Sequence, residues 1–221
     1  MPDFNGFYPE TIDFFMGIGL NNNQEWYHAH KEAYNQYVKQ PITALAEGVY
    51  ARMQAMDPDF NDKPKVSRIN RDTRFSKNKS PYKTSSWFFL REDGSPGIQH
   101  EKPCYFFEIM TTGYWYGLSF SPPSAALRSR MRAKMAANPV ELERHAVWVA
   151  EHPDFTFSGE AYQKMPSLDL PPALMDWAIR KEILICRKLP LDDLLFSPGL
   201  LERLYEDYAA LYPIYEYFYQ L

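Results

Sequence analysis

One short segment, from Arg68 to Lys83, gathers side chains that bind anions. It contains Arg68, Arg71 and Arg74, and Lys79 and Lys83 follow near its end. A guanidinium group can bind a phosphate or a carboxylate through two parallel hydrogen bonds, and an ammonium group adds a point charge. We therefore predict an anion-binding site in this segment, with these five side chains as its cationic ligands.

Two further residues of the segment, Asp72 and Tyr82, are the candidates for catalysis. Asp72 lies between Arg71 and Arg74, so its carboxylate either orients one guanidinium through a charge-assisted pair or acts as a base beside a substrate. Tyr82 supplies a hydroxyl group that could orient a ligand. The alternative is a solvated loop that pairs with the acidic remainder of the chain. We favour the anion site because loops on a rigid sheet commonly carry function.

The charge of the chain is unevenly distributed. Between Lys63 and Lys83, eight basic residues against one acidic residue give a net charge of +7, whereas the whole chain carries −4. A net acidic protein is not typical of dedicated nucleic-acid binders. A small anionic ligand is thus the expected partner, and nucleic acid is not. The alternative function is a non-enzymatic module that docks an acidic protein or a nucleic-acid backbone, with Trp87 as a stacking platform.

Familiar catalytic and cofactor-binding motifs are missing from the sequence. His28 and His30 lie two residues apart, a spacing that does not place both on one helix face. The chain has no HExxH, CxxC, GxSxG, Walker or dinucleotide-binding motif. We expect no metal and no cofactor, and we leave open whether the protein is an enzyme. Hydrolysis or group transfer on a phosphorylated or acidic small molecule is the reaction class we favour.

The pattern of apolar residues predicts the elements that position the segment. Aromatic and β-branched runs predict strands, and apolar residues at helical spacing predict helices. The turn signals between the middle strands are short, at Glu92–Gly94 and Thr112-Gly113, which favours antiparallel pairing. Strands are predicted at 65–70, 85–90, 104–110, 114–120, 155–157 and 182–188. Helices are predicted at 9–20, 24–40, 42–53, 122–137, 139–151, 171–180 and from Ser197 onward, with a kink or break at Pro213.

These elements predict an α+β fold. We expect a single domain over residues 1–221, with a mainly antiparallel central sheet of five or six strands, helices packed mostly on one side and a helical carboxyl terminus. The segment from Arg68 to Lys83 then becomes a strand that runs into an ordered loop before the next strand. The tyrosines of the last helix pack it onto the sheet or form a dimer surface, so a homo-oligomer stays open.

The cysteines and the amino terminus indicate where the protein resides. Cys104 and Cys186 lie in apolar runs, which suits buried, reduced thiols. No apolar run is long enough to span a bilayer, and the amino terminus lacks the features of a secretory signal. We expect a cytoplasmic protein without a membrane partner.

The basic segment also carries a family resemblance. Its pattern is Arg68, then Arg71-Asp72, Arg74-Phe75, Asn78-Lys79 and finally Tyr82, and with this pattern the chain resembles the DUF2461 family. Phe4-Asn5-Gly6-Phe7 and the stretch from Asn22 to Trp26 fit the family as well. One departure is Lys102-Pro103-Cys104-Tyr105, where a glycine-rich start of a strand is expected. The resemblance implies one domain over the chain and a site at the motif, without implying a particular reaction.

Overall fold

A computed structural model describes residues 3–74, 77–91, 101–122, 124–164 and 168–221 of the chain. Phe75 of the family pattern and the predicted turn at Glu92–Gly94 lie outside the described residues.

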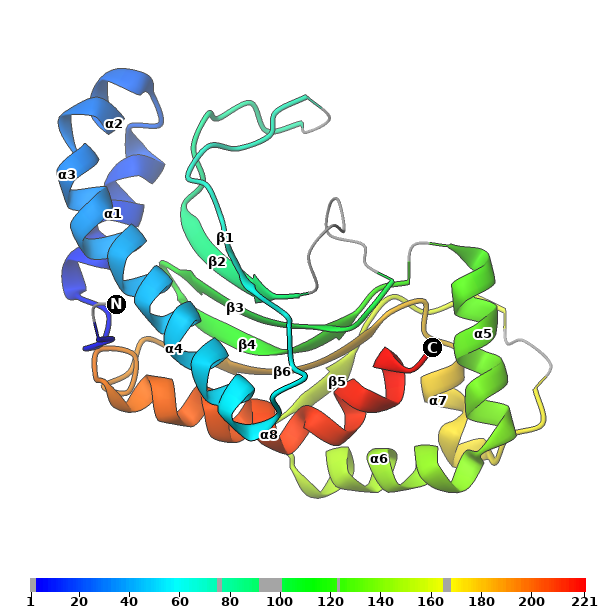
Figure 1. The fold of residues 1–221 in the computed structure, drawn as a ribbon. Helices are drawn as coiled ribbons and strands as arrows, with labels where there is room; N and C mark the ends of the chain where they lie inside the picture. Colours follow the sequence, from blue (N-terminus) through cyan, green and yellow to red (C-terminus); the bar gives the residue numbers. More distant parts are fainter. Residues whose placement is uncertain (1–2, 75–76, 92–100, 123, 165–167) are drawn as a thin grey trace. The chain divides into compact units, whose positions relative to one another are not determined.

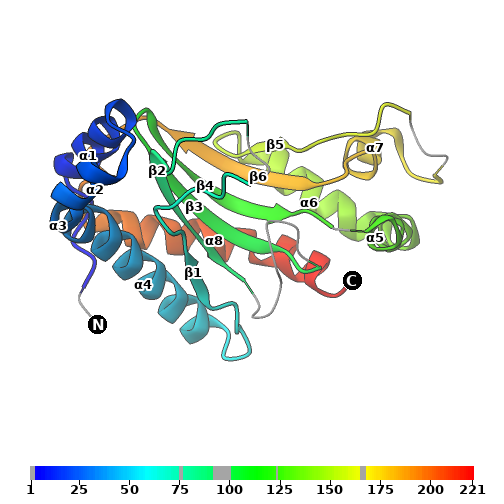
Figure 2. The same cartoon turned by 90° about the horizontal axis from the view of Figure 1, so that it is seen from above.

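The strands form a six-stranded antiparallel sheet in the order β1-β2-β3-β4-β6-β5 (Figure 2). Its members are β1 (Pro64–Val66), β2 (Ser85–Leu90), β3 (Cys104–Met110), β4 (Gly113–Phe120), β5 (Thr156–Ser158) and β6 (Ile183–Leu189). At the two edges, Lys65 of β1 pairs with Phe89 of β2, and Phe157 of β5 pairs with Ile185 of β6. The predicted α+β fold with a mainly antiparallel sheet is confirmed.

Helices precede, interrupt and follow the strands. They are α1 (Pro9–Leu20), α2 (Gln24–Ala29), α3 (Lys31–Ala33), the π-helical turn η1 (Tyr34–Lys39), α4 (Gln40–Met56), α5 (Ala125–Ala137), α6 (Pro139–Glu151), the 3₁₀ turn η2 (Pro172–Leu174), α7 (Met175–Ala178) and α8 (Gly199–Tyr219). Pro41 stands where η1 runs directly into α4, and the carbonyl of Tyr37, four residues before it, accepts from the hydroxyl of Thr11 instead of from a helical N–H. The predicted helical carboxyl terminus is confirmed. Of the kink or break predicted at Pro213, the break does not occur, since α8 continues through this residue.

The chain packs into two compact units, each made of separate stretches of sequence. Unit 1 comprises residues 1–90, 106–115 and 188–206, and unit 2 comprises residues 91–105, 116–187 and 207–221. The boundaries fall within elements, since β3, β4, β6 and α8 each contribute residues to both units.

In unit 1, α4 packs against β1 and β2 (Figure 1). Leu45, Val49 and Met53 of α4 are fully buried, as are Phe88 and Leu90 of β2. Because side chains alternate along a strand, Ser85, Trp87 and Phe89 of β2 point to the other face of the sheet, where they are half-buried. We call this second face the open face. The basic segment, Arg68 to Lys83, lies between β1 and β2 in the chain.

In unit 2, aromatic side chains pack α8 onto the sheet. The ring of Tyr208 stacks on Tyr105 of β3 with centroids 4.6 Å apart, and Phe218 stacks on Phe120 of β4 at 5.3 Å. Cys104 and Cys186 are buried. Among the described residues, no helix is both long and apolar enough to cross a bilayer.

Candidate functional site

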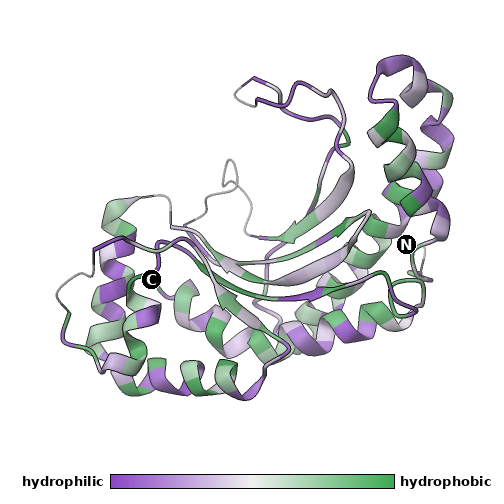
Figure 3. Cartoon of the chain, turned by 180° about the vertical axis from the view of Figure 1, so that it is seen from behind, coloured by the Kyte–Doolittle hydropathy of each residue, from purple (hydrophilic) through white to green (hydrophobic). Residues whose placement is uncertain are grey.

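The described parts of the basic segment, residues 68–74 and 77–83, form the two arms of a β-hairpin that extends β1 and β2 beyond their ends (Figure 1). The ladder continues through the N–H of Ser67, which donates to the carbonyl of Trp87 at 2.8 Å. The N–H groups of Lys83 and Arg71 then donate to the carbonyls of Ile69 and Pro81, at 2.9 and 2.8 Å. Figure 3 colours the end of this hairpin as hydrophilic, in contrast to the strands below it. The backbone of the motif is therefore held in register by the sheet.

This register places Arg71 and Lys83 on one face of the hairpin. Ile69 stands opposite Lys83, and Arg71 follows Ile69 by two residues, so Arg71 and Lys83 occupy diagonal positions on the same face. Diagonal neighbours of an antiparallel ladder have α-carbons about 7–8 Å apart, within reach of long side chains. The hairpin thus brings two of the predicted ligands together.

Lys83 has an ammonium group that lies in a crowded basic environment. It donates a hydrogen bond to the carbonyl of Arg68 at 2.5 Å and stands 5.4 Å from the ring centroid of Trp87. Burial lowers the pKa of Lys83, and the nearby charges of Arg71 and Arg68 lower it further, while the carboxylate of Glu108 acts in the opposite direction. Positive charge is concentrated here at the cost of mutual repulsion.

Arg71 contributes an unsatisfied hydrogen-bond donor to the same place. Its side chain is half-buried, and its Nε is shielded from solvent without a hydrogen-bond partner among the residues that the structure describes. Leaving a buried donor unpaired costs about 1–3 kcal/mol, and more for a charged group. An acceptor that reaches Arg71 from outside the protein would remove this cost.

At the tip of the hairpin, the predicted residues interact with one another. Arg74 donates from Nε and Nη2 to the two carboxylate oxygens of Asp72, at 3.0 and 2.7 Å. This pair holds the pKa of Asp72 down at about 2, mainly through the hydrogen bonds from Arg74. Lys79 donates to the carbonyl of Thr73 at 2.8 Å. Asp72, Arg74 and Lys79 are exposed, and each has a partner within the described part of the hairpin.

Tyr82 lies on the face of the hairpin opposite to Arg71 and Lys83. Its side chain is 4% exposed, and its ring packs on Tyr27 with centroids 4.6 Å apart. Its backbone exchanges hydrogen bonds with the side chain of Asn22, which accepts from the N–H at 2.9 Å and donates to the carbonyl at 3.1 Å. Tyr82 anchors the hairpin to the loop before α2, away from the cationic pair.

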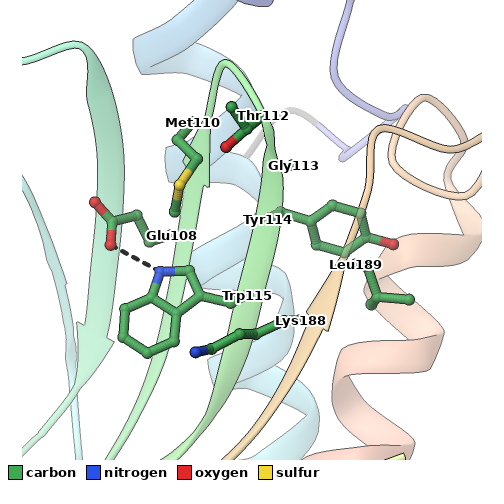
Figure 4. Close-up of a pocket in the computed structure, with 8 residues that line it drawn as sticks. All are labelled: Glu108, Met110, Thr112, Gly113, Tyr114, Trp115, Lys188 and Leu189. Carbon is green, nitrogen blue, oxygen red and sulfur yellow. Dashed lines mark hydrogen bonds between the residues drawn. The ribbon is translucent and has the colours of Figure 1, made fainter.

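Sequence reasoning missed the residues of the open face that lie beside Lys83. Glu108 of β3 accepts a hydrogen bond from the hydroxyl of Ser85 at 2.7 Å and another from the indole N–H of Trp115 at 2.8 Å (Figure 4). The sequence contained a signal for Glu108, because it is the one acidic residue in the apolar run of β3. An ionised side chain rarely stands in such a run without a partner.

A cavity of about 340 Å³ opens next to Glu108, and Met110 and Trp115 are among its lining residues (Figure 4). Lys188 of β6 also lines it, with its ammonium 5.6 Å from the centroid of the Trp115 ring. The open face of unit 1 therefore offers cations, one carboxylate and aromatic surface. Within the described ranges, no group of three or more His, Cys, Asp or Glu side chains could hold a metal ion.

These features define an α+β protein whose antiparallel sheet carries a basic hairpin beside a polar open face. The family model described as "Conserved hypothetical protein (DUF2461)" matches residues 10–217, and the chain belongs to this family. The sequence matches no curated protein.

Proposed function

We propose that the protein binds a small molecule through a phosphate or carboxylate group at the base of the hairpin. Arg71 and Lys83 are its principal ligands, and Arg68 adds positive charge. The observation that carries this proposal is the Nε of Arg71, which is buried without a partner among the described residues and shares a face with Lys83.

An anion at this place would relieve two unfavourable features at once. It would accept the unpaired hydrogen bond of Arg71, and it would offset the repulsion that lowers the pKa of Lys83. A partly buried site strengthens both interactions, because charges attract more strongly where water is excluded. Arg74 and Lys79 contribute to the field of the hairpin, but their own hydrogen bonds favour a structural role.

The surroundings favour a ligand with an apolar or aromatic body. Trp87 and Trp115 expose part of their rings on the open face, and the cavity beside Glu108 has the volume of a small-molecule site. A docking surface for an acidic protein or a nucleic-acid backbone is the competing function. The half-buried state of Arg71 and Lys83 favours the small ligand, since a docking patch works through exposed cations.

If the protein is an enzyme, Glu108 is better placed than Asp72 to handle a proton. Asp72 is engaged by Arg74 at the hairpin tip, whereas Glu108 lies close enough to Lys83 to influence its pKa. Hydrolysis or group transfer on a phosphorylated or acidic small molecule is the reaction class we propose. A cytoplasmic site of action belongs to this proposal, because a chain with only two cysteines, Cys104 and Cys186, does not build the disulfide framework typical of small secreted proteins.

A thermal-shift screen tests the proposal. The protein would be heated with sulfate, phosphate, citrate, sugar phosphates, nucleotides and a short oligonucleotide, because a ligand of the native state raises the melting temperature by mass action. One class of small anion should stabilise the parent and the Arg74→Ala variant, but not the Arg71→Ala variant. Stabilisation by the oligonucleotide alone, lost steeply with salt, would establish the docking function instead.

A further inference from the structure

Unit 2 contains a second cavity, of about 400 Å³, between α6 and α8. Its apolar lining comes from Trp148 of α6 and from Ala210, Pro213 and Ile214 of α8. Charged groups of both signs, Glu141, Arg144 and Glu216, complete the lining. The cavity shares no lining residue with the basic hairpin, whose residues all belong to unit 1.

Two residues that line this cavity each carry a buried polar atom without a hydrogen bond. These atoms are the hydroxyl of Tyr217 and the Nε2 of His145, and neither has a partner among the described parts of the chain. Tyr217 is 2% exposed, and its ring meets the imidazole of His145 edge to face, with centroids 5.0 Å apart. The ammonium of Lys134 lies over the Tyr217 ring at 4.5 Å and donates to the backbone carbonyl of the same residue. The phenol ring is thus fixed in place while its hydroxyl has no partner.

Both groups are uncharged near neutral pH. Burial raises the pKa of Tyr217, and the carboxylate of Glu141 raises it further. Burial also lowers the pKa of His145, and the cations Lys134 and Arg144 add to this effect against the opposing influence of Glu141. A neutral phenol donates one hydrogen bond, and a neutral imidazole that carries its proton on Nδ1 accepts one at Nε2.

One hydroxyl group can accept a hydrogen bond from a phenol and donate one to an unprotonated imidazole nitrogen, so its chemistry matches what both atoms lack. The cavity is much larger than the roughly 30 Å³ that one water molecule occupies in the liquid, so a water molecule alone leaves most of it unfilled. Trp148 offers an aromatic surface for the rest of the ligand, and its ring is held by stacking on His152 at 4.1 Å. We propose that this cavity binds a small neutral aromatic alcohol, with Tyr217 and His145 as the ligands of its hydroxyl group.

Fluorine NMR with two probes tests this site. 4-Fluorophenol carries the hydroxyl group and fluorobenzene lacks it, so the difference in affinity reports the polar contact. We expect 4-fluorophenol to bind the full-length protein and fluorobenzene to bind about three- to tenfold more weakly, the effect of one neutral hydrogen bond. Equal affinity of the two probes, or no binding of either, would overturn the proposal.

Two variants test whether Tyr217 makes the hydrogen bond to the hydroxyl group of 4-fluorophenol. Tyr217→Phe should lower the affinity for 4-fluorophenol by about three- to tenfold and leave the affinity for fluorobenzene unchanged. Tyr212→Phe removes a hydroxyl from the same helix outside the cavity lining and should leave both affinities unchanged. In the absence of a probe, the melting temperature of the Tyr217→Phe variant should equal or exceed that of the parent protein, because the hydroxyl that it lacks had no hydrogen-bond partner. A clear drop in melting temperature would show that the hydroxyl is already satisfied and would overturn the site.

Discussion

The carboxylate of Asp72 forms two hydrogen bonds with the guanidinium of Arg74, two residues further along the hairpin. This pair holds the pKa of Asp72 near 2, below its ordinary value. Its small, solvent-screened contribution to stability is therefore complete above the ordinary carboxyl pKa and is lost as the pH falls toward 2. Carbon NMR titration should show this low pKa in the parent and a return to about 3.9 in Arg74→Ala. An ordinary pKa in the parent would mean that the pair does not form in solution.

Lys83 should impose a pH dependence on anion binding. Its lowered pKa means that its ammonium loses the proton at lower pH than an ordinary lysine does. Affinity for sulfate, which keeps its charge throughout, should fall as the pH rises through that pKa. Calorimetric titrations of Lys83→Met should show weaker binding without this fall. Lys79→Met, which removes an exposed lysine of the same hairpin, should keep the parent profile, and an equal loss in that variant would contradict the assignment.

Glu108 should weaken anion binding through its negative charge. Its carboxylate raises the pKa of Lys83 and therefore counteracts the positive field at the site. Glu108→Gln should bind sulfate a few-fold more tightly and keep both contacts, since its amide oxygen can accept from Trp115 and its amide nitrogen can donate to the hydroxyl of Ser85. Glu32→Gln, which removes an exposed acid on α3, serves as the control and should bind like the parent. Unchanged affinity in Glu108→Gln would place the anion elsewhere.

Stability of unit 2 should depend on the ion pair between Arg187 and Asp207. The Nε of Arg187 lies 3.1 Å from the carboxylate of Asp207, which is 8% exposed and also accepts a hydrogen bond from Tyr116 at 2.7 Å. Arg187→Ala leaves this buried charge without its guanidinium, and we expect a loss of about 3–5 kcal/mol in urea unfolding. Asp154→Ala removes the exposed partner of the same arginine and should cost at most about 1 kcal/mol. Similar losses in the two variants would mean that burial does not set the energy of this pair.

Much of the fold could be predicted from the sequence, because the local signals agree with the final packing. The aromatic run in Ser85–Leu90 predicted β2 with both of its ends, and the helical spacing after Ser197 predicted α8. At Pro213, where a kink or break was predicted, the helix continues, and the buried side chains of Ile214, Tyr215 and Phe218 pack the turns around the proline.

The grouping of site residues was harder to predict, because it depends on pairing between strands. Residue type alone treats Arg68, Arg71 and Arg74 as equivalent cations. Only the register opposite Pro81 and Lys83 shows that Arg71 shares a face with Lys83, and only the geometry of the tip shows that Arg74 is engaged by Asp72. The contribution of Glu108 comes from β3, far away in the sequence, and enters through the sheet.

The most direct test of the anion site is nitrogen–proton NMR of the arginine side chains during a sulfate titration. The Nε–H signal of Arg71, identified by its disappearance in Arg71→Lys, should shift and saturate as sulfate fills the site. The signal of Arg74 should stay nearly fixed, since its Nε already donates to Asp72. A shift of Arg74 without Arg71, or no saturable shift of either signal, would contradict the account.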